Sequence, residues 1–313
     1  MDACVLCGSP RSISVLAGVR YASEAEVRRC ADCGLVFPRP RPTAEELADY
    51  YAEPYRKEYN EPPMLERYRA DLDEARARVR LLLPLLRPDS RLIEIGSGSG
   101  AFLEAVRPYV GEVTGVEPDA PSRDWIAGKL GLPAVDKVAA LSRQGKTCDT
   151  MVLFHVLEHV LHPVEFLRSL SPLLEKRGRL VVEVPNVGDA LVAVYAVPAY
   201  LSFYYQKAHL YYFSKVTLGK ALKDAGFAGV IEHIQRYDLS NHFHWMLTGR
   251  PGGQGCYSDI LSPSACAAYA EGLIRAGHSD TLWAVVQAGA DNDACRCGAS
   301  PGESRSSANP ISY

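Results

Sequence analysis

The sequence predicts an α/β protein, in which helices cover both faces of a mainly parallel sheet and a small metal-binding module precedes it. Strand and helix signals alternate over residues 88–237, and such alternation is typical of a parallel sheet. Apolar runs such as MVLF and LVVEV suit strands that are buried on both faces. Two C-x2-C pairs near the start of the chain indicate the separate module. The 313 residues are enough for one large domain with a small addition.

The composition argues against several classes of protein. The 34 Lys and Arg against 37 Asp and Glu give a net charge of -3, which disfavours a strongly basic nucleic-acid binder and a polybasic membrane anchor. The longest apolar stretch, residues 190–201, contains Pro198 and is too short to span a bilayer. Residues 1–10 do not resemble a signal peptide. We therefore expect a cytoplasmic protein without a membrane partner, whose clustered cysteines bind metal.

The chain is expected to divide into a zinc-ribbon-like module, a helical cap, an α/β domain with an insertion, and a tail. The module ends in the Pro/Arg segment FPRPRP, which must be extended. In the cap, Thr43 is placed to start one helix, and LERYRADLDEARARVRLLLPLL reads as a long amphipathic one. The tail is rich in Ser, Gly, Pro and Ala, and we expect it to be disordered. The expected bounds are 1–42 for the module, 43–87 for the cap, 88–290 for the domain, about 238–280 for its insertion and 291–313 for the tail.

The α/β domain contains clear strand and helix signals. Pro163 fits a first helical position, Ser214 fits an N-cap, and Gly226 suits the end of a helix. We expect strands at residues 91–95, 112–116, 133–135, 150–154, 179–184, 230–237 and 281–287. We expect helices at residues 100–107, 121–129, 163–174 and 215–225.

The most informative segment is RLIEIGSGSGAFLEAV, in which an apolar strand runs into a glycine-rich loop and then a helix. Gly96, Gly98 and Gly100 allow a tight turn and let a ligand approach the backbone closely. Glu94 lies inside the strand. Glu117 ends the next strand, where its carboxylate is suited to accept hydrogen bonds from two ribose hydroxyls. The extra carboxylate disfavours a pyrophosphate cofactor and tolerates a cationic one, whereas the alternative for both carboxylates is a solvated strand end.

Four segments in succession resemble the motifs of class I S-adenosylmethionine-dependent methyltransferases: E-I-G-S-G-S-G, V-E-P-D, C-D-T-M-V-L-F-H-V-L-E-H-V and G-R-L-V-V-E-V-P-N. The resemblance implies a Rossmann-like, seven-stranded sheet whose last strand is antiparallel, with S-adenosylmethionine as the cofactor. The cofactor residues that it implies are Glu94, Gly96, Gly98 and Gly100 at the methionine end, Glu117 at the ribose, Asp136 at the adenine, and Phe154 and His155 facing the cofactor.

The segment FHVLEHVLHP carries the candidate catalytic residues. If it forms a helical turn, His155 lies beside Glu158 and His159, and His209 is a candidate fourth member. Metal-dependent O-methyltransferases have a similar E-x-x-E-H segment with a downstream His, although here His155 replaces the first Glu. Three alternatives stay open: a divalent metal such as Mg²⁺ bound by these four residues, a histidine that acts as general base without metal, and a purely structural role.

The paired cysteines, Cys4, Cys7, Cys30 and Cys33, form a C-x2-C-x22-C-x2-C arrangement. Two such turns present four thiolates with the geometry that suits tetrahedral zinc. A module this small needs the metal to fold, and a closed site of four cysteines has a structural role. The arrangement resembles one found ahead of bacterial methyltransferases of glycan and natural-product gene clusters, where C-x2-C…C-x2-C-G-L-V-F is frequent.

These features together predict methyl transfer from S-adenosylmethionine to a hydroxyl of a small molecule, such as a sugar or a natural-product intermediate. The expected insertion resembles that of methyltransferases encoded near polysaccharide genes, which favours a sugar or glycosylated acceptor. The polar and aromatic residues of this insertion are Asn241, His242, His244 and Trp245.

Other functions remain as alternatives. The methyl group has a nitrogen or a carbon of a small molecule as an alternative acceptor atom. The sequence does not predict an oligomeric state. An rRNA or tRNA methyltransferase would use the zinc module to bind RNA, which the net charge disfavours. A nicotinamide oxidoreductase and a zinc scaffold without activity are two more alternatives. The local basic stretch that an RNA-binding module would use comprises Arg28, Arg29, Arg39 and Arg41.

Overall fold

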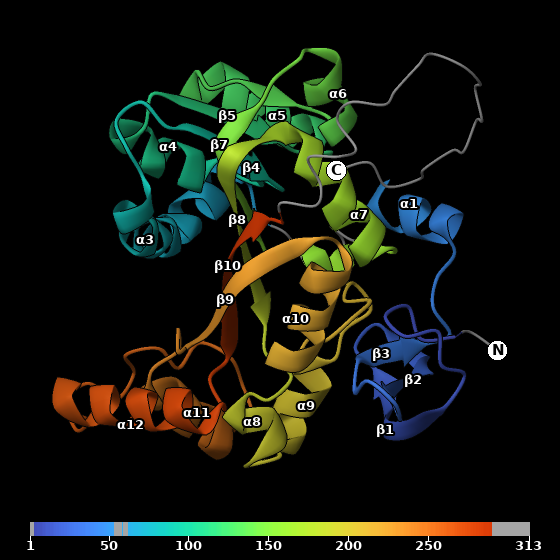
Figure 1. Ribbon diagram of the computed structural model, residues 1–313. Coiled ribbons are helices and arrows are strands. Elements are labelled where there is room, and N and C mark those ends of the chain that lie inside the picture. Colours follow the sequence, from blue (N-terminus) through green and yellow to red (C-terminus); the bar gives the residue numbers. More distant parts are fainter. Residues whose placement is uncertain (1–2, 53–57, 59–61, 290–313) are drawn as a thin grey trace.

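A seven-stranded sheet forms the centre of the computed structural model, which describes residues 3–52, 58 and 62–289 (Figure 1). Its strand order is β6-β5-β4-β7-β8-β10-β9, and β10 runs antiparallel to both of its neighbours. The other pairs are parallel, so the predicted α/β class and the antiparallel last strand are confirmed. The strands are β4 (Arg91–Ile95), β5 (Glu112–Val116), β6 (Ala134–Val135), β7 (Cys148–Phe154), β8 (Leu174–Pro185), β9 (Phe227–Ile234) and β10 (Thr281–Ala288).

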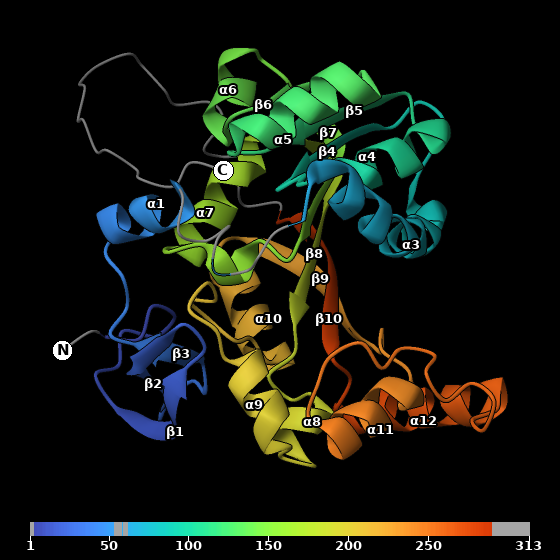
Figure 2. The same cartoon turned by 180° about the vertical axis from the view of Figure 1, so that it is seen from behind.

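Helices cover both faces of this sheet, and Figures 1 and 2 show α3 and α4 on one side with α7 and α10 on the other. One apolar cluster joins the sheet to α3 and α4, through residues such as Val79 and Leu103. A second cluster joins the opposite face to α7 and α10, through Leu167 and Leu222. The helices are α1 (Ala44–Ala52), α3 (Met64–Leu82), α4 (Ala101–Val106), α5 (Ala120–Trp125), α6 (Val138–Arg143), α7 (Pro163–Leu170), α8 (Ala190–Ala193), α9 (Pro198–Tyr204), α10 (Lys215–Asp224), α11 (Leu239–Thr248) and α12 (Pro263–Ala276).

Polar side chains fix the starts of several helices. Thr43 and Glu46 exchange bonds at the start of α1, since the Thr43 hydroxyl accepts from the Glu46 N–H and the Glu46 carboxylate accepts from the Thr43 N–H. Ser214 forms the same kind of capping box with Thr217 and confirms the predicted N-cap of α10. Pro163 occupies the first position of α7, as predicted.

One helix and one strand on the later part of the sheet end at least three residues earlier than the sequence predicts. The helix expected over 163–174 stops at Leu170, because Pro172 has no N–H to donate to the carbonyl of Arg168. The strand expected over 230–237 stops at Ile234. The backbone N–H groups of Arg236 and Tyr237 instead donate to the carboxylate of Asp280, and these bonds turn the chain away from the sheet.

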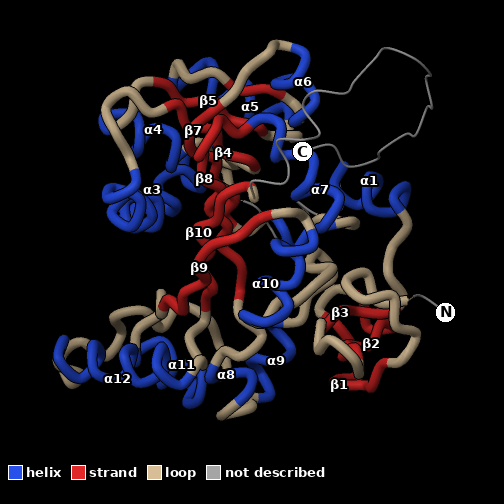
Figure 3. The backbone as a smooth tube through the Cα atoms, viewed as in Figure 1, coloured by secondary structure: helices blue, strands red, loops and turns tan. Residues whose placement is uncertain are grey.

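The N-terminal part of the chain forms its own three-stranded antiparallel sheet, shown at the lower right of Figure 3. Its strands are β1 (Ser12–Val19), β2 (Ala22–Cys30) and β3 (Val36–Arg39). The backbone of Tyr212 pairs with Val36, and Arg20 pairs with Gln206, so this sheet packs directly against the segment that follows α9. Apolar contacts between Val27 and the aromatic residues of that segment complete the interface.

The region expected as an insertion contains α11 and α12, which lie beyond the end of β9 (Figure 1). Trp245 of α11 packs edge-on against Tyr200 of α9, with ring centroids 5.0 Å apart. Among the described residues, no helix has the length and apolar character needed to cross a bilayer. The expected tail, residues 291–313, lies outside the described residues.

Asp189 is a buried carboxylic acid whose protonation is linked to the stability of the fold. Its Oδ1 accepts from the Leu191 N–H at 2.8 Å and its Oδ2 accepts from the Tyr200 hydroxyl at 2.7 Å. Burial raises the pKa of Asp189 to about 7. Because the pKa of this carboxyl group is higher in the folded than in the unfolded state, its protonated form stabilises the fold. This stabilisation is complete below the unfolded pKa near 4 and is lost as the pH rises through 7.

We therefore expect the stability of the Asp189→Asn variant, relative to that of the wild type, to increase as the pH rises from 4 to 7. Asn keeps an oxygen for the Leu191 N–H and can donate to the Tyr200 oxygen, but it carries no charge to bury. The free energy of unfolding of the variant, relative to that of the wild type, is expected to be about 4 kcal/mol higher at pH 8 than at pH 4, measured by urea unfolding. Parallel pH profiles for the two proteins would contradict the assignment.

Candidate active site

The loop between β4 and α4 requires glycine at three positions. Gly96, Gly98 and Gly100 have φ values of 76°, 51° and 75°, a region that residues with a Cβ rarely adopt. A Cβ on Gly96 would lie only 2.5 Å from Cγ2 of Val156. The loop therefore brings its backbone N–H groups to the carboxyl ends of the parallel strands, where ligands bind in open α/β sheets.

Two carboxylates adjoin this loop. Glu94 is 4% exposed, its Oε2 has no hydrogen-bond partner among the described residues, and burial raises its pKa well above the ordinary value. Glu117 accepts from the Gly98 N–H at 2.7 Å and from the Asp119 N–H at 2.9 Å. A buried oxygen without a partner suits an ammonium group, and carboxylate oxygens with further lone pairs suit ribose hydroxyls. The residues at this loop therefore fit S-adenosylmethionine.

Helix α3, part of the predicted helical cap, covers the same loop through residues that the sequence analysis did not single out. The Ser99 hydroxyl donates to Asp71 Oδ2 at 2.6 Å. The guanidinium of Arg67 lies so close to Gly98 that a Cβ there would be 3.1 Å from its Nη2. Asp71 and Ser99 are 28 residues apart in the sequence, so no local pattern could have paired these two residues.

The remaining predicted cofactor residues lie in different surroundings. Asp136 follows β6, is about half exposed, and lies 3.7 Å from Lys137. The ring of Phe154 is buried between Phe102 and Trp283, with centroid distances of 4.8 and 5.7 Å. Phe154 is therefore a packing residue between the sheet and α4 in this structure.

His155 follows β7 and lies in a network of charged groups. Its φ of 54° places it in the left-handed region. Nδ1 lies 3.1 Å from Glu158 Oε1, and Nε2 lies 3.0 Å from Glu183 Oε1 and 2.6 Å from Arg236 Nη1. Burial opposes a charged imidazole, but the hydrogen bonds to the two carboxylates outweigh it and raise the pKa of His155.

Glu183 joins this network to α3. Arg78 donates to both of its carboxylate oxygens, at 2.9 and 3.0 Å, and Arg236 lies 3.2 Å from Oε1. Glu74 of α3 pairs with both guanidinium groups. The sequence analysis missed these four residues, although a Glu within the apolar run LVVEV was one available signal.

A second group gathers Glu158, His159 and His209, with one ligand atom from each within 4.8 Å of the others. Glu158 is 1% exposed, and its Oε2 has no partner among the described residues. Nδ1 of His159 lies 2.9 Å from the carbonyl oxygen of Ala208. Because a carbonyl only accepts, this Nδ1 carries the hydrogen and Nε2 keeps its lone pair.

Both imidazoles of this group are neutral near pH 7. Burial lowers the pKa of His159, and burial also lowers the pKa of His209, to about 3. The structure thus brings together three of the four residues proposed for a second metal site. His155 instead gathers with Glu74 and Glu183, because its left-handed backbone breaks the helical turn and the 3-10 turn begins only at Leu157.

The four cysteines of the N-terminal module converge on one point. Sγ of Cys4 lies 3.5 Å from Sγ of Cys33, and Sγ of Cys7 lies 3.5 Å from Sγ of Cys30. All four sulfur atoms lie within 4.8 Å of one another. Tetrahedral zinc, with Zn–S bonds of about 2.3 Å, places its sulfur ligands about 3.8 Å apart. The four thiols therefore fit a zinc ion.

Comparison with known families gives a match over the centre of the chain. The family model described as "Methyltransferase domain" matches residues 64–233, which is more than half of the chain. No curated protein matches. This match covers α3, the glycine loop, both carboxylates and the two groups of histidines.

Three solved structures are similar to this chain. An S-adenosylmethionine-dependent methyltransferase from Archaeoglobus fulgidus is 19% identical, with 71% of this chain and 96% of that chain covered and a TM-score of 0.49. A second structure is a Haloferax volcanii complex of the Trm112 methyltransferase activator with a methyltransferase. It is 14% identical, with 78% of this chain and 98% of that chain covered and a TM-score of 0.48. The third structure is a Thermotoga maritima protein described as a possible histamine N-methyltransferase. It is 18% identical, with 78% of this chain and 99% of that chain covered and a TM-score of 0.47.

We expect Gly96→Ala to weaken binding of S-adenosylhomocysteine at least tenfold, because the added Cβ meets Val156 and the left-handed φ is unfavourable for Ala. Isothermal titration calorimetry measures the affinity. Gly128→Ala is the matched control, since a Cβ at Gly128 meets nothing within 4 Å. Equal affinities for Gly96→Ala and the control would show that the loop does not hold the cofactor.

Proposed function

This chain belongs to the methyltransferase-domain family, and we propose that it transfers the methyl group of S-adenosylmethionine to a hydroxyl group of a small-molecule acceptor. The observation that carries the choice of a hydroxyl is the group of Glu158, His159 and His209. Two neutral imidazoles and a buried carboxylate oxygen without a partner converge there. A hydroxyl needs help in losing its proton, whereas a neutral amine already has a nucleophilic lone pair.

In the proposed reaction, the chemistry supplied by the bound cofactor is an activated methyl group on a sulfonium. Glu94, Glu117 and the glycine loop would hold the cofactor. His159 would accept the hydroxyl proton at Nε2, because the Ala208 carbonyl fixes the hydrogen of this ring on Nδ1. The carboxylate of Glu158 would stabilise the imidazolium that forms. The acceptor oxygen would form its bond to the methyl carbon as the carbon–sulfur bond breaks, and the electron pair of the broken bond would stay on sulfur.

The same three side chains support an alternative in which a divalent cation assists the reaction. Glu158, His159 and His209 would hold the cation, which would lower the pKa of a bound hydroxyl. Two imidazole nitrogens favour a transition metal over Mg²⁺, which prefers oxygen ligands. His155 is outside this set of ligands and would contribute through its contact with Glu158.

The N-terminal module has a separate role in this proposal. We propose that Cys4, Cys7, Cys30 and Cys33 bind one structural zinc ion. The distances between their sulfur atoms support this assignment. A site closed by four thiolates leaves no position for an acceptor or a water molecule, so the zinc would hold the module together without entering the reaction.

We expect His159→Asn to lower kcat about 100-fold without changing the affinity for S-adenosylhomocysteine. Asn can still donate to the Ala208 carbonyl but provides no basic nitrogen. Formation of S-adenosylhomocysteine with a panel of alcohols, phenols and glycosides measures the activity, and exposed His162→Asn is the control. Loss of wild-type activity with EDTA, restored by Mn²⁺, would favour the metal-assisted alternative. Full activity of His159→Asn would contradict both.

We expect the Cys7→Ser/Cys30→Ser double variant to lose one equivalent of zinc per chain relative to the wild type, as measured by plasma mass spectrometry. The truncated ligand set cannot close a tetrahedral site. Cys256→Ser, which removes an exposed thiol elsewhere, is the control. Equal zinc contents in all three proteins, or disulfides among these four cysteines in protein kept under reducing conditions, would rule out the site.

A further inference from the structure

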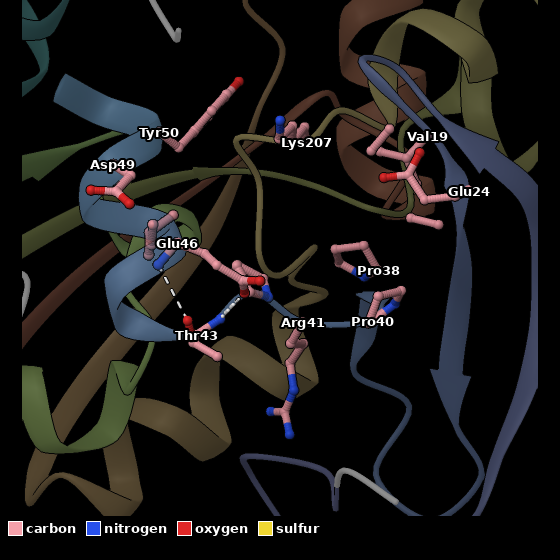
Figure 4. Close-up of a pocket in the computed structure, with 14 residues that line it drawn as sticks. Val19, Glu24, Pro38, Pro40, Arg41, Thr43, Glu46, Asp49, Tyr50 and Lys207 are labelled. Atoms are coloured by element: carbon pink, nitrogen blue, oxygen red, sulfur yellow. Dashed lines mark hydrogen bonds between the residues drawn. The ribbon is translucent and has the colours of Figure 1, made fainter. Parts of the chain in front are cut away.

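A cavity of about 670 Å³ lies between the N-terminal module and α1. Figure 4 shows α1 with Asp49 and Tyr50 on one side and the module with Val19 and Glu24 on the other. Lys207, from the segment that leads to His209, closes one end. The volume is within the range of pockets that hold small organic ligands.

The walls of the cavity are largely apolar. Val19 and Ala22 of the module and Leu47 of α1 are buried residues of the lining, and Figure 4 shows Pro38 and Pro40 on the side of the module. Such walls pack against the carbon face of a sugar ring or against an aromatic group.

The two cationic side chains that line the cavity, Lys207 and Arg41, already have partners within the protein. Lys207 lies over the Tyr50 ring at 4.5 Å and pairs with Glu58 at 3.6 Å. Arg41 donates to the Ala3 carbonyl at 2.9 Å, and in Figure 4 its guanidinium points away from the cavity.

Three exposed carboxylates line the cavity, those of Glu24, Glu46 and Asp49. The Glu46 carboxylate accepts from the Thr43 N–H, whereas the carboxylates of Glu24 and Asp49, on opposite walls, make no hydrogen bond or ion pair with any described residue. Carboxylates accept hydrogen bonds and repel anions. The cavity therefore favours a ligand that donates hydrogen bonds and carries no negative charge.

Two short connections join this cavity to the proposed site of methyl transfer. Tyr50 is followed by Tyr51, whose hydroxyl oxygen lies 2.9 Å from Nδ1 of His159. Lys207 is followed by Ala208, whose carbonyl fixes the same nitrogen, and then by His209. Two pairs of neighbouring residues thus separate the cavity from the group of Glu158, His159 and His209. Tyr50 and Lys207 line the cavity, and the residues that follow them, Tyr51 and Ala208, contact His159.

We propose that this cavity binds the body of the methyl acceptor, an uncharged, hydroxyl-rich glycoside, and that the N-terminal module forms one wall of the acceptor site. This inference rests on the proposed function and names the substrate class of that site. The carboxylates of Glu24 and Asp49 accept hydrogen bonds from sugar hydroxyls, while the proline and aliphatic walls pack against the apolar face of the ring. The module is then part of the recognition of the acceptor.

The test uses the full-length protein saturated with S-adenosylhomocysteine and two probes that share one sugar. p-Nitrophenyl β-D-glucopyranoside is uncharged, and UDP-glucose carries two phosphates. Saturation-transfer NMR is expected to detect binding of the first probe only. The double variant Glu24→Gln/Asp49→Asn is expected to weaken that binding at least tenfold, since two charged acceptors are lost. Glu45→Gln, on the same helix but outside the cavity, is expected to change nothing.

Three outcomes would overturn the inference: no binding of the uncharged probe, binding that the double variant leaves unchanged, and tighter binding of UDP-glucose. Titration of S-adenosylhomocysteine into the same proteins separates the two proposals. Cofactor binding without glycoside binding would defeat the acceptor site alone. Absence of cofactor binding in the wild type would defeat the proposed function itself.

Discussion

The charge of Glu183, buried in the central sheet, is the constraint on which the placement of α3, His155 and Arg236 depends. Glu183 is 2% exposed, and a buried carboxylate without partners costs several kcal/mol. Burial alone would raise its pKa, but the bonds to His155 and Arg78 outweigh burial and keep the pKa far below the ordinary value. Each partner comes from a different element: Arg78 from α3, His155 from the end of β7, and Arg236 from beyond β9. The network therefore fixes the relative positions of these elements.

This anchoring also shapes the cofactor side of the site. The helix that supplies Arg78 to Glu183 supplies Asp71 to the glycine loop, where Asp71 accepts from Ser99. The guanidinium of Arg78 lies 4.6 Å from the centre of the Phe154 ring, which packs the same helix on the sheet. Helix α3 is thus held over the loop by a buried ion pair at one point and a hydrogen bond at another. These contacts fix α3 of the predicted cap against the α/β domain at the glycine loop.

Local patterns in the sequence predicted the parts of this arrangement that local interactions determine. The predicted bounds of β4 and β5 agree with the structure, and the glycines of the loop have the left-handed φ values that the motif requires. The end of β9 was placed too late because it depends on Asp280, 44 residues away from Arg236. Glu74, Arg78, Glu183 and Arg236 escaped prediction for the same reason, since only the folded chain brings together charges from three separate elements.

The segment between α9 and α10 links the N-terminal module to the group of Glu158, His159 and His209. Its Leu210 N–H donates to the carbonyl of Glu158 at 2.8 Å, and two residues later the Tyr212 N–H donates to the carbonyl of Val36 in the module. His209 lies immediately before these anchors. On the other side of His209, the Lys207 N–H donates to the carbonyl of Arg20 at 2.9 Å. Because backbone bonds hold the chain on both sides of His209, the position of its imidazole depends on the folding of the module as well as on the sheet. A zinc ion that takes no part in the reaction would still stabilise the geometry in which the reaction occurs.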